Sequence, residues 1–261
     1  MKIVAFRTGI PYRLRNPRGG DRAIVFVHGA AGNKLAWLRC TRYLAALLPD
    51  HPIYYLDLPG HGESTKPPEL SIDGYAEVLL EFLEELRLSP AVLVGHSMGG
   101  AVALTAALRE PMAVEKIAVM GSGYRITLAT GLIELLEDDY PKAIGMIRDF
   151  GFGDNPSPQE VATTMESLMS CDPETAITDF KALAEYDVKG EIGRLRPPLA
   201  VFYGSSDKLT SPERNRALAD AVPDAEHHAF EGAGHMLMLE RPEELASQLA
   251  RFIVPDFDDS A

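Results

Sequence analysis

The chain has 261 residues, of which 46% are hydrophobic and 24% charged, a composition typical of a globular protein long enough to bury a sizeable core. Its formal net charge of −13 argues against nucleic acid or an anionic membrane surface as a partner. The two cysteines, Cys40 and Cys171, stand far apart in the sequence, which argues against a disulfide framework and favours a reducing compartment.

Three further observations concern the location of the protein and its need for metals or cofactors. Residues 1–7 form too short an apolar run for a signal peptide and no stretch approaches the length of a membrane span, so we expect a cytoplasmic protein. No group of His, Cys, Asp and Glu has metal-ligand spacing. The glycine-rich segment 57–64 lacks the lysine and the spacing of a phosphate-binding loop, so we interpret it as a structural turn. We therefore expect no metal and no cofactor, and the sequence leaves the oligomeric state open.

Short β-rich runs alternate with helical patterns along most of the chain, as in a parallel α/β sheet. The strands expected are an opening hairpin at residues 2–7 and 11–15, then residues 23–27, 53–56, 91–94, 116–120, 199–203 and 227–230. The helices expected are residues 36–48, 72–88, 98–109, a segment after Pro212, and residues 242–253.

Between residues 124 and 196 this rhythm stops. Only helical stretches remain, and they are broken by Pro141, Gly151, Pro156, Pro158 and Pro173. We expect one α/β core, residues 1–123 and 197–255, that carries a helical insertion at residues 124–196. A frayed tail is expected at residues 256–261.

The most informative stretch is Gly-His-Ser-Met-Gly-Gly at residues 95–100, which directly follows the apolar run 91–94. A strand that turns sharply into a helix here would force Ser97 into a sparsely populated backbone conformation and hold its hydroxyl clear of the sheet. Gly95 and Gly99 fit that turn because a Cβ at either would collide where strand and helix crowd together. The sequence therefore predicts that Ser97 is a nucleophile rather than part of a chance loop motif.

A serine hydroxyl needs a base, and the base needs a group that orients it. Asp207 follows the expected strand 199–203, and His235 lies in a glycine-flanked loop after the last expected strand. Alone, each would be interpreted as a turn or solvated residue. Both, however, fall at the carboxyl ends of parallel strands, in the chain order serine, acid, histidine that this architecture uses. We predict that Asp207 and His235 are catalytic together with Ser97.

A tetrahedral oxyanion needs backbone N–H donors beside the nucleophile. The Met98 N–H, directly after Ser97, is one expected donor. The second is expected from the small-residue loop 28–32, where Ala30 N–H is our candidate; the alternative is that this loop is only a tight glycine turn. His28 is expected to support the loop rather than react.

The other histidines are expected to be structural. His96 should point back into the fold, and His51 precedes a strand at the end opposite the site. His227 and His228 lie within or beside the last expected strand.

Together these motifs resemble the α/β-hydrolase superfamily, in its serine-nucleophile branch, over essentially the whole chain. The residues that carry the resemblance are His28 and Gly29, the segments 57–64 and 95–100, Gly204 with Asp207, and Gly234 and His235 followed by Glu240, Arg241 and Pro242. The resemblance implies an α/β-hydrolase fold, an eight-stranded, mostly parallel sheet flanked by helices, with residues 124–196 as a helical cap over the site. It also implies Ser97, Asp207 and His235 as the triad.

The chain looks most similar to small carboxylesterases with a helical cap. We expect a serine hydrolase that cleaves small-to-medium, largely apolar carboxylic esters through an acyl-enzyme. Met146, Met165 and Met169 could line an adaptable apolar pocket, although packing within the cap is the plainer interpretation. Two alternatives stay open. One is a carbon–carbon bond hydrolase of the ring-fission type, which resembles this chain but commonly carries Asn at the position of His96, and the other is a non-catalytic ligand-binding protein.

Overall fold

The computed structural model describes residues 3–5, 7–20 and 22–257. Parts of two predicted segments therefore lie outside the described residues, namely residues 2 and 6 of the opening hairpin and residues 258–261 of the tail. The strands are β1 (Ile3–Val4), β2 (Pro11–Arg15), β3 (Ile24–Val27), β4 (Ile53–Leu56), β5 (Ala91–His96), β6 (Val114–Met120), β7 (Leu199–Gly204) and β8 (Glu226–Phe230). The helices of the core are α1 (Leu38–Leu47), α2 (Ile72–Glu85), α3 (Met98–Arg109), α8 (Pro212–Asp220), α9 (Leu237–Glu240) and α10 (Pro242–Ile253), with short 3-10 helices η1 (Lys34–Trp37), η2 (Pro111–Ala113) and η3 (Ile192–Arg194).

The described strands form one sheet in the order β1-β2-β4-β3-β5-β6-β7-β8. Only the pairs β1–β2 and β2–β4 are antiparallel, and every pair from β4 to β8 is parallel. The predicted fold class, an α/β-hydrolase fold with a mostly parallel sheet flanked by helices, is therefore confirmed. The chain leaves β3 toward β4 on one side and later returns to β5 on the other. Such a reversal opens a crevice at the carboxyl ends of the two central strands.

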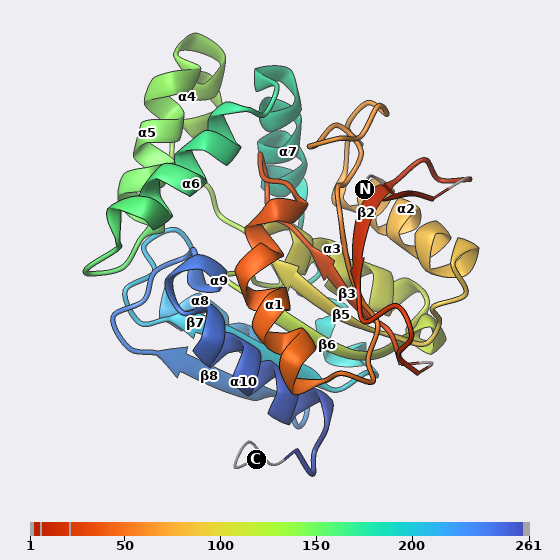
Figure 1. Ribbon diagram of the computed structural model, residues 1–261. Helices are drawn as coiled ribbons and strands as arrows, with labels where there is room; N and C mark the ends of the chain where they lie inside the picture. Colours follow the sequence, from red (N-terminus) through yellow and green to blue (C-terminus); the bar gives the residue numbers. More distant parts are fainter. Residues whose placement is uncertain (1–2, 6, 21, 258–261) are drawn as a thin grey trace.

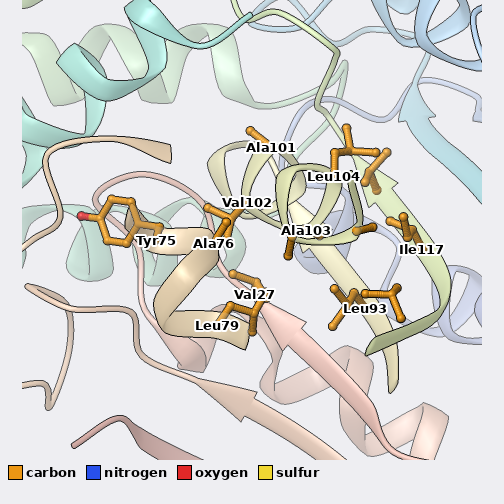
Figure 2. Close-up of a cluster of buried hydrophobic side chains, with 14 of the residues drawn as sticks. Val27, Tyr75, Ala76, Leu79, Leu93, Ala101, Val102, Ala103, Leu104 and Ile117 are labelled. Atoms are coloured by element: carbon orange, nitrogen blue, oxygen red, sulfur yellow. The ribbon is translucent and has the colours of Figure 1, made fainter. Parts of the chain in front are cut away.

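Both faces of the sheet are covered by helices. Val25 and Leu93 point to the face that packs on α2, α3 and α8, whereas Ile24 and Phe26 point to the face that packs on α1, α9 and α10. Because successive side chains of a strand alternate between faces, a strand covered on both sides must be apolar throughout. Figure 2 shows the first of these layers, where side chains of α2 and α3 pack on β3, β5 and β6.

Most predicted boundaries agree closely with the observed ones. The helices predicted at 98–109 and 242–253 are α3 and α10. The helix predicted at 36–48 is instead split into η1 and α1, and the helix predicted at 72–88 ends at Glu85. The four-residue helix α9 has no counterpart among the predicted elements.

Four α-helices, followed by η3, lie between β6 and β7: α4 (Leu132–Asp138), α5 (Tyr140–Gly151), α6 (Pro158–Met169) and α7 (Pro173–Glu185). They gather at the top of the view in Figure 1, apart from the helices that flank the sheet. Three prolines that interrupt the sequence pattern, Pro141, Pro158 and Pro173, stand in the first turns of α5, α6 and α7, where a missing N–H costs little. The boundaries of the insertion as a unit stay a prediction.

Two further findings concern membrane spans and metal sites. None of the helices in the described residues is long and apolar enough to cross a membrane. Within the same residues, no group of three or more His, Cys, Asp and Glu side chains is placed to hold a metal ion.

Candidate active site

Ser97 stands at the sharp turn between β5 and α3. Its φ of 51° and ψ of −115° lie in a sparsely populated region for a residue with a side chain. The Ser97 N–H donates to Met120 O over 2.9 Å, and the Ser97 carbonyl accepts from Ser122 Oγ over 2.9 Å. A Cβ on Gly95 would collide with the backbone of Gly99, so the turn can close only with glycine there. The predicted strained turn is confirmed.

A buried imidazole–carboxylate pair, His235 and Asp207, stands on the loops that follow β8 and β7. His235 Nδ1 lies 2.9 Å from Asp207 Oδ2, and both side chains are almost fully buried. The other carboxylate oxygen of Asp207 accepts the N–H groups of Leu209 and Thr210, each over 2.9 Å. Since a carboxylate only accepts, His235 carries its proton on Nδ1, and in the neutral ring Nε2 keeps a lone pair that can accept a proton.

The loop after β3 closes as a turn in which Gly32 N–H donates to Gly29 O over 3.1 Å. Ala31, the third residue of that turn, has a positive φ of 54°. The Ala31 N–H donates to Asp179 Oδ2 over 2.9 Å. The N–H groups of Ala30 and Met98 have no acceptor among the described residues, so both are free to donate to a bound group.

Two neutral histidines support these loops. His28 Nδ1 contacts Gly29 O over 2.8 Å and its Nε2 accepts from Leu58 N–H over 3.1 Å, while burial lowers its pKa to about 3. His96 is buried as expected, but it also contacts the loop that carries His235: its Nε2 donates to the carbonyl of His235 over 3.0 Å. Burial, and then the proximity of His235, hold the pKa of His96 well below its usual value. Both rings are therefore neutral supports near neutral pH.

Ser97, His235, Ala30 and His96 all border one cavity of about 590 Å³, a size typical of sites for small molecules. The insertion supplies most of its apolar wall: Leu132, Met146, Ile147, Phe150, Leu168, Phe180 and Leu183. Charged side chains also border it, namely Glu166, Lys208 and Arg214. The cavity therefore joins a polar floor at the strand ends to an apolar roof.

Of the three methionines predicted for the pocket, only Met146 borders this cavity. Met165 packs against the apolar cluster of the insertion, and Met169 is 44% exposed. Packing within the insertion, the plainer interpretation, thus describes Met165, and neither residue lines this cavity, because helical spacing alone does not tell which face of α6 meets it.

The sequence analysis missed three supporting residues. Glu240 accepts from the N–H groups of Gly153 and Gly234 over 2.9 and 3.0 Å, which fixes the loop that carries His235. Burial raises the pKa of Glu240.

The other two residues, Asp179 and His61, form a buried pair, with 2.7 Å between Asp179 Oδ2 and His61 Nε2. Segment 57–64 is thus more than a turn, but its partner lies 118 residues further along the chain and gave no local signal.

The fold is that of the α/β hydrolases, and comparison with known proteins agrees. The model of the α/β hydrolase family matches residues 24–248. The chain therefore belongs to the α/β hydrolase family.

Among similar proteins, a pimeloyl-[acyl-carrier protein] methyl ester esterase from Photobacterium profundum is 25% identical over 251 residues, 90% of this chain and 95% of that protein. Among solved structures, the enol-lactonase from Burkholderia xenovorans superposes with a TM-score of 0.87 at 21% identity, covering 97% of this chain and 99% of that one. An esterase from Exiguobacterium antarcticum gives 0.85 at 20% identity, covering 97% and 98%. At these identities the structural matches speak for the fold alone.

Proposed function

We propose that this protein is a serine carboxylesterase in which Ser97 is the nucleophile, His235 the base and Asp207 the residue that orients the base. Ester hydrolysis in general is supported by the esterases among its relatives. The observation that carries the proposal is the buried His235–Asp207 pair, of which His235 borders the same cavity as Ser97 at its strained turn.

In the proposed reaction, Ser97 Oγ attacks the ester carbonyl while His235 Nε2 takes its proton. The negative charge that develops on the carbonyl oxygen is stabilised by the free N–H groups of Met98 and Ala30, and Met98 also begins α3, whose N-terminal end favours negative charge. His235 then gives its proton to the leaving alcohol. Finally it removes a proton from a water molecule that attacks the acyl-enzyme and returns this proton to Ser97 Oγ as the bond to the acyl group breaks, which releases the acid and restores Ser97.

We further propose that the insertion at residues 124–196 acts as a cap that selects the substrate. Its aliphatic and aromatic side chains form the roof of a cavity of about 590 Å³. Burying an apolar chain there is favourable by about 0.8 kcal/mol per methylene. This supports small-to-medium, largely apolar esters as substrates.

The test is hydrolysis of p-nitrophenyl esters from acetate to dodecanoate, with Ser97→Ala as the control. We expect turnover that depends on Ser97 and passes through an optimum of chain length. Absence of turnover across the series, with a fluorophosphonate still attached to Ser97, would contradict ester cleavage and favour the carbon–carbon hydrolase. Absence of both turnover and labelling would contradict a serine hydrolase altogether.

A further inference from the structure

Asp179 is a buried carboxylate on α7 of the insertion, and all three of its hydrogen-bond donors belong to the core. Its Oδ2 accepts the Ala31 N–H over 2.9 Å and His61 Nε2 over 2.7 Å. Its Oδ1 accepts the Tyr75 hydroxyl over 2.7 Å. The side chain is fully buried. Burying a carboxylate costs free energy unless it is paired and hydrogen-bonded. The three donors to Asp179 offset that cost.

The three donors come from separate parts of the core. Ala31 lies in the loop after β3, His61 in the turn after β4, and Tyr75 in α2. Figure 2 shows the ring of Tyr75 at the edge of the core cluster, with its hydroxyl directed away from the other labelled side chains. Asp179 therefore fastens the insertion to three elements of the core at one point.

The contact with Ala31 determines the orientation of a peptide group beside the proposed oxyanion site. In the turn from Gly29 to Gly32, the positive φ of Ala31 at the third position corresponds to a type II turn, which usually places glycine there. Turns of type I and type II differ by a flip of their central peptide, here the one between Ala30 and Ala31. A flip would turn the Ala30 carbonyl oxygen toward the carboxylate of Asp179, where two acceptors would face each other. Asp179 thus favours the observed orientation.

The methyl group of Ala31 strengthens the same link. It is fully buried within the apolar cluster of the insertion, which includes Leu136, Ile144 and Ala176. An alanine at positive φ is strained, and here that strain is offset by packing and by a hydrogen bond, both from the insertion.

His61 is the cationic partner of Asp179. Its Nδ1 lies 2.9 Å from Pro59 O and its Nε2 lies 2.7 Å from Asp179 Oδ2. Neither oxygen can donate, so both ring nitrogens carry protons and the ring is an imidazolium. Burial lowers the pKa of His61, but the charge and the hydrogen bond of Asp179 outweigh it and raise the pKa overall.

The other groups that face His61 are few. The negative charge of Asp57 also raises the pKa of His61, but by less than Asp179 does, and Asp57 is itself paired with Lys34. The neutral ring of His28 lies 4.8 Å away and the ring of Tyr75 6.3 Å away, both measured between ring centroids.

We propose that Asp179 is a positioning residue, which acts through the Ala31 N–H to hold the Gly29–Gly32 turn so that the Ala30 N–H meets the developing oxyanion, with the His61 imidazolium as its counter-ion. This inference rests on the proposed function. It means that the insertion helps to assemble the site for the transition state and does more than enclose the substrate.

The test compares Asp179→Leu, which removes the acceptor, with Asp179→Asn, which keeps an oxygen for Ala31 but removes the charge. Asp172→Asn is the matched control, because Asp172 is an exposed acid at the start of the same helix. We expect Asp179→Leu to lower kcat by about 10²-fold, the effect of losing one oxyanion donor, with KM within about threefold of the wild type. Asp179→Asn should retain kcat within about tenfold at pH 6, and Asp172→Asn should match the wild type.

The pH dependence separates positioning from a merely structural role. Without the charge of Asp179, His61 loses its second proton at a lower pH, and one of its two hydrogen bonds is then lost. The ratio of kcat for Asp179→Asn to kcat for the wild type should therefore fall as the pH rises, up to the pH at which His61 of the wild type also loses its second proton.

Each outcome is decisive. If Asp179→Leu turns over like the wild type, or if its loss is confined to KM, the inference is wrong. If Asp179→Leu fails to fold, the pH series decides, and a constant ratio overturns the inference while a falling ratio supports it. If the wild type neither hydrolyses esters nor reacts with a fluorophosphonate, the proposed function fails and this inference fails with it.

Discussion

The two sides of the cavity are built in different ways. On the core side, Ser97, Asp207 and His235 stand on short loops that each follow a strand of one continuous sheet. On the other side, four helices pack through an apolar cluster and contact the core through side chains, as at Asp179, and through backbone, as at Gly151, whose carbonyl accepts the His235 N–H. Reacting groups of open parallel sheets gather at the carboxyl ends of the strands, where the sheet fixes the start of each loop. In the proposed function the sheet carries the chemistry and the helices select the substrate, and in our further inference Asp179 joins the two tasks.

The largest expected effect lies on the core side. Replacement Ser97→Ala should lower kcat by about 10⁶-fold, because a triad without its nucleophile retains only the catalysis of the remaining site. The free energy of unfolding should change little, since the Ser97 side chain is only partly buried. Steady-state kinetics and urea unfolding measure the two quantities, and substantial residual activity in a folded variant would place the nucleophile elsewhere.

The second-largest effect is expected from Asp207→Asn, which tests whether Asp207 orients His235. The amide can donate to His235 and so favours the wrong tautomer, which should lower kcat by about 10⁴-fold. The hydrogen bonds from Leu209 and Thr210 to the remaining side-chain oxygen can persist, so we expect a folded protein. A kcat close to that of the wild type would show that another acid orients His235.

On the insertion side, the expected effects are smaller and concern the choice of substrate. Met146→Ala enlarges the cavity and should move the optimum toward longer acyl chains, by about fourfold in kcat/KM for each methylene accommodated. Met169→Ala is the control, because Met169 is exposed and does not border the cavity. The contrast between core and insertion would break down if Met146→Ala reduced turnover of all esters equally.

The smallest effect expected is on the pH dependence of stability. The pKa of His61 is raised above 6.5 in the folded protein, so its pair with Asp179 stabilises fully below about pH 6.5 and loses that contribution as the pH rises through the raised value. In His61→Gln this contribution is absent at every pH. The difference in unfolding free energy between the wild type and His61→Gln, measured by urea unfolding, should therefore shrink toward alkaline pH, and a constant difference would show that the imidazolium is not what stabilises the pair.

The same contrast explains what could be predicted from the sequence. The positions of Ser97 and Asp207 follow from local patterns, since an apolar strand and its following turn residues are neighbours in the chain. The roof follows other rules: α6 is amphipathic, but its sequence does not tell whether the cavity or solvent meets Met169. The contact between Ala31 and Asp179 joins residues 148 positions apart, and no local pattern carries such a pairing.

The central claim is that the three core residues form one working site with Ser97 as nucleophile. The most direct measurement is peptide mapping by mass spectrometry after titration with a fluorophosphonate, together with residual esterase activity. The account predicts one adduct per chain, on Ser97, with activity lost in proportion to labelling. Full labelling of Ser97 with undiminished turnover, or loss of activity with the adduct on another residue, would contradict it.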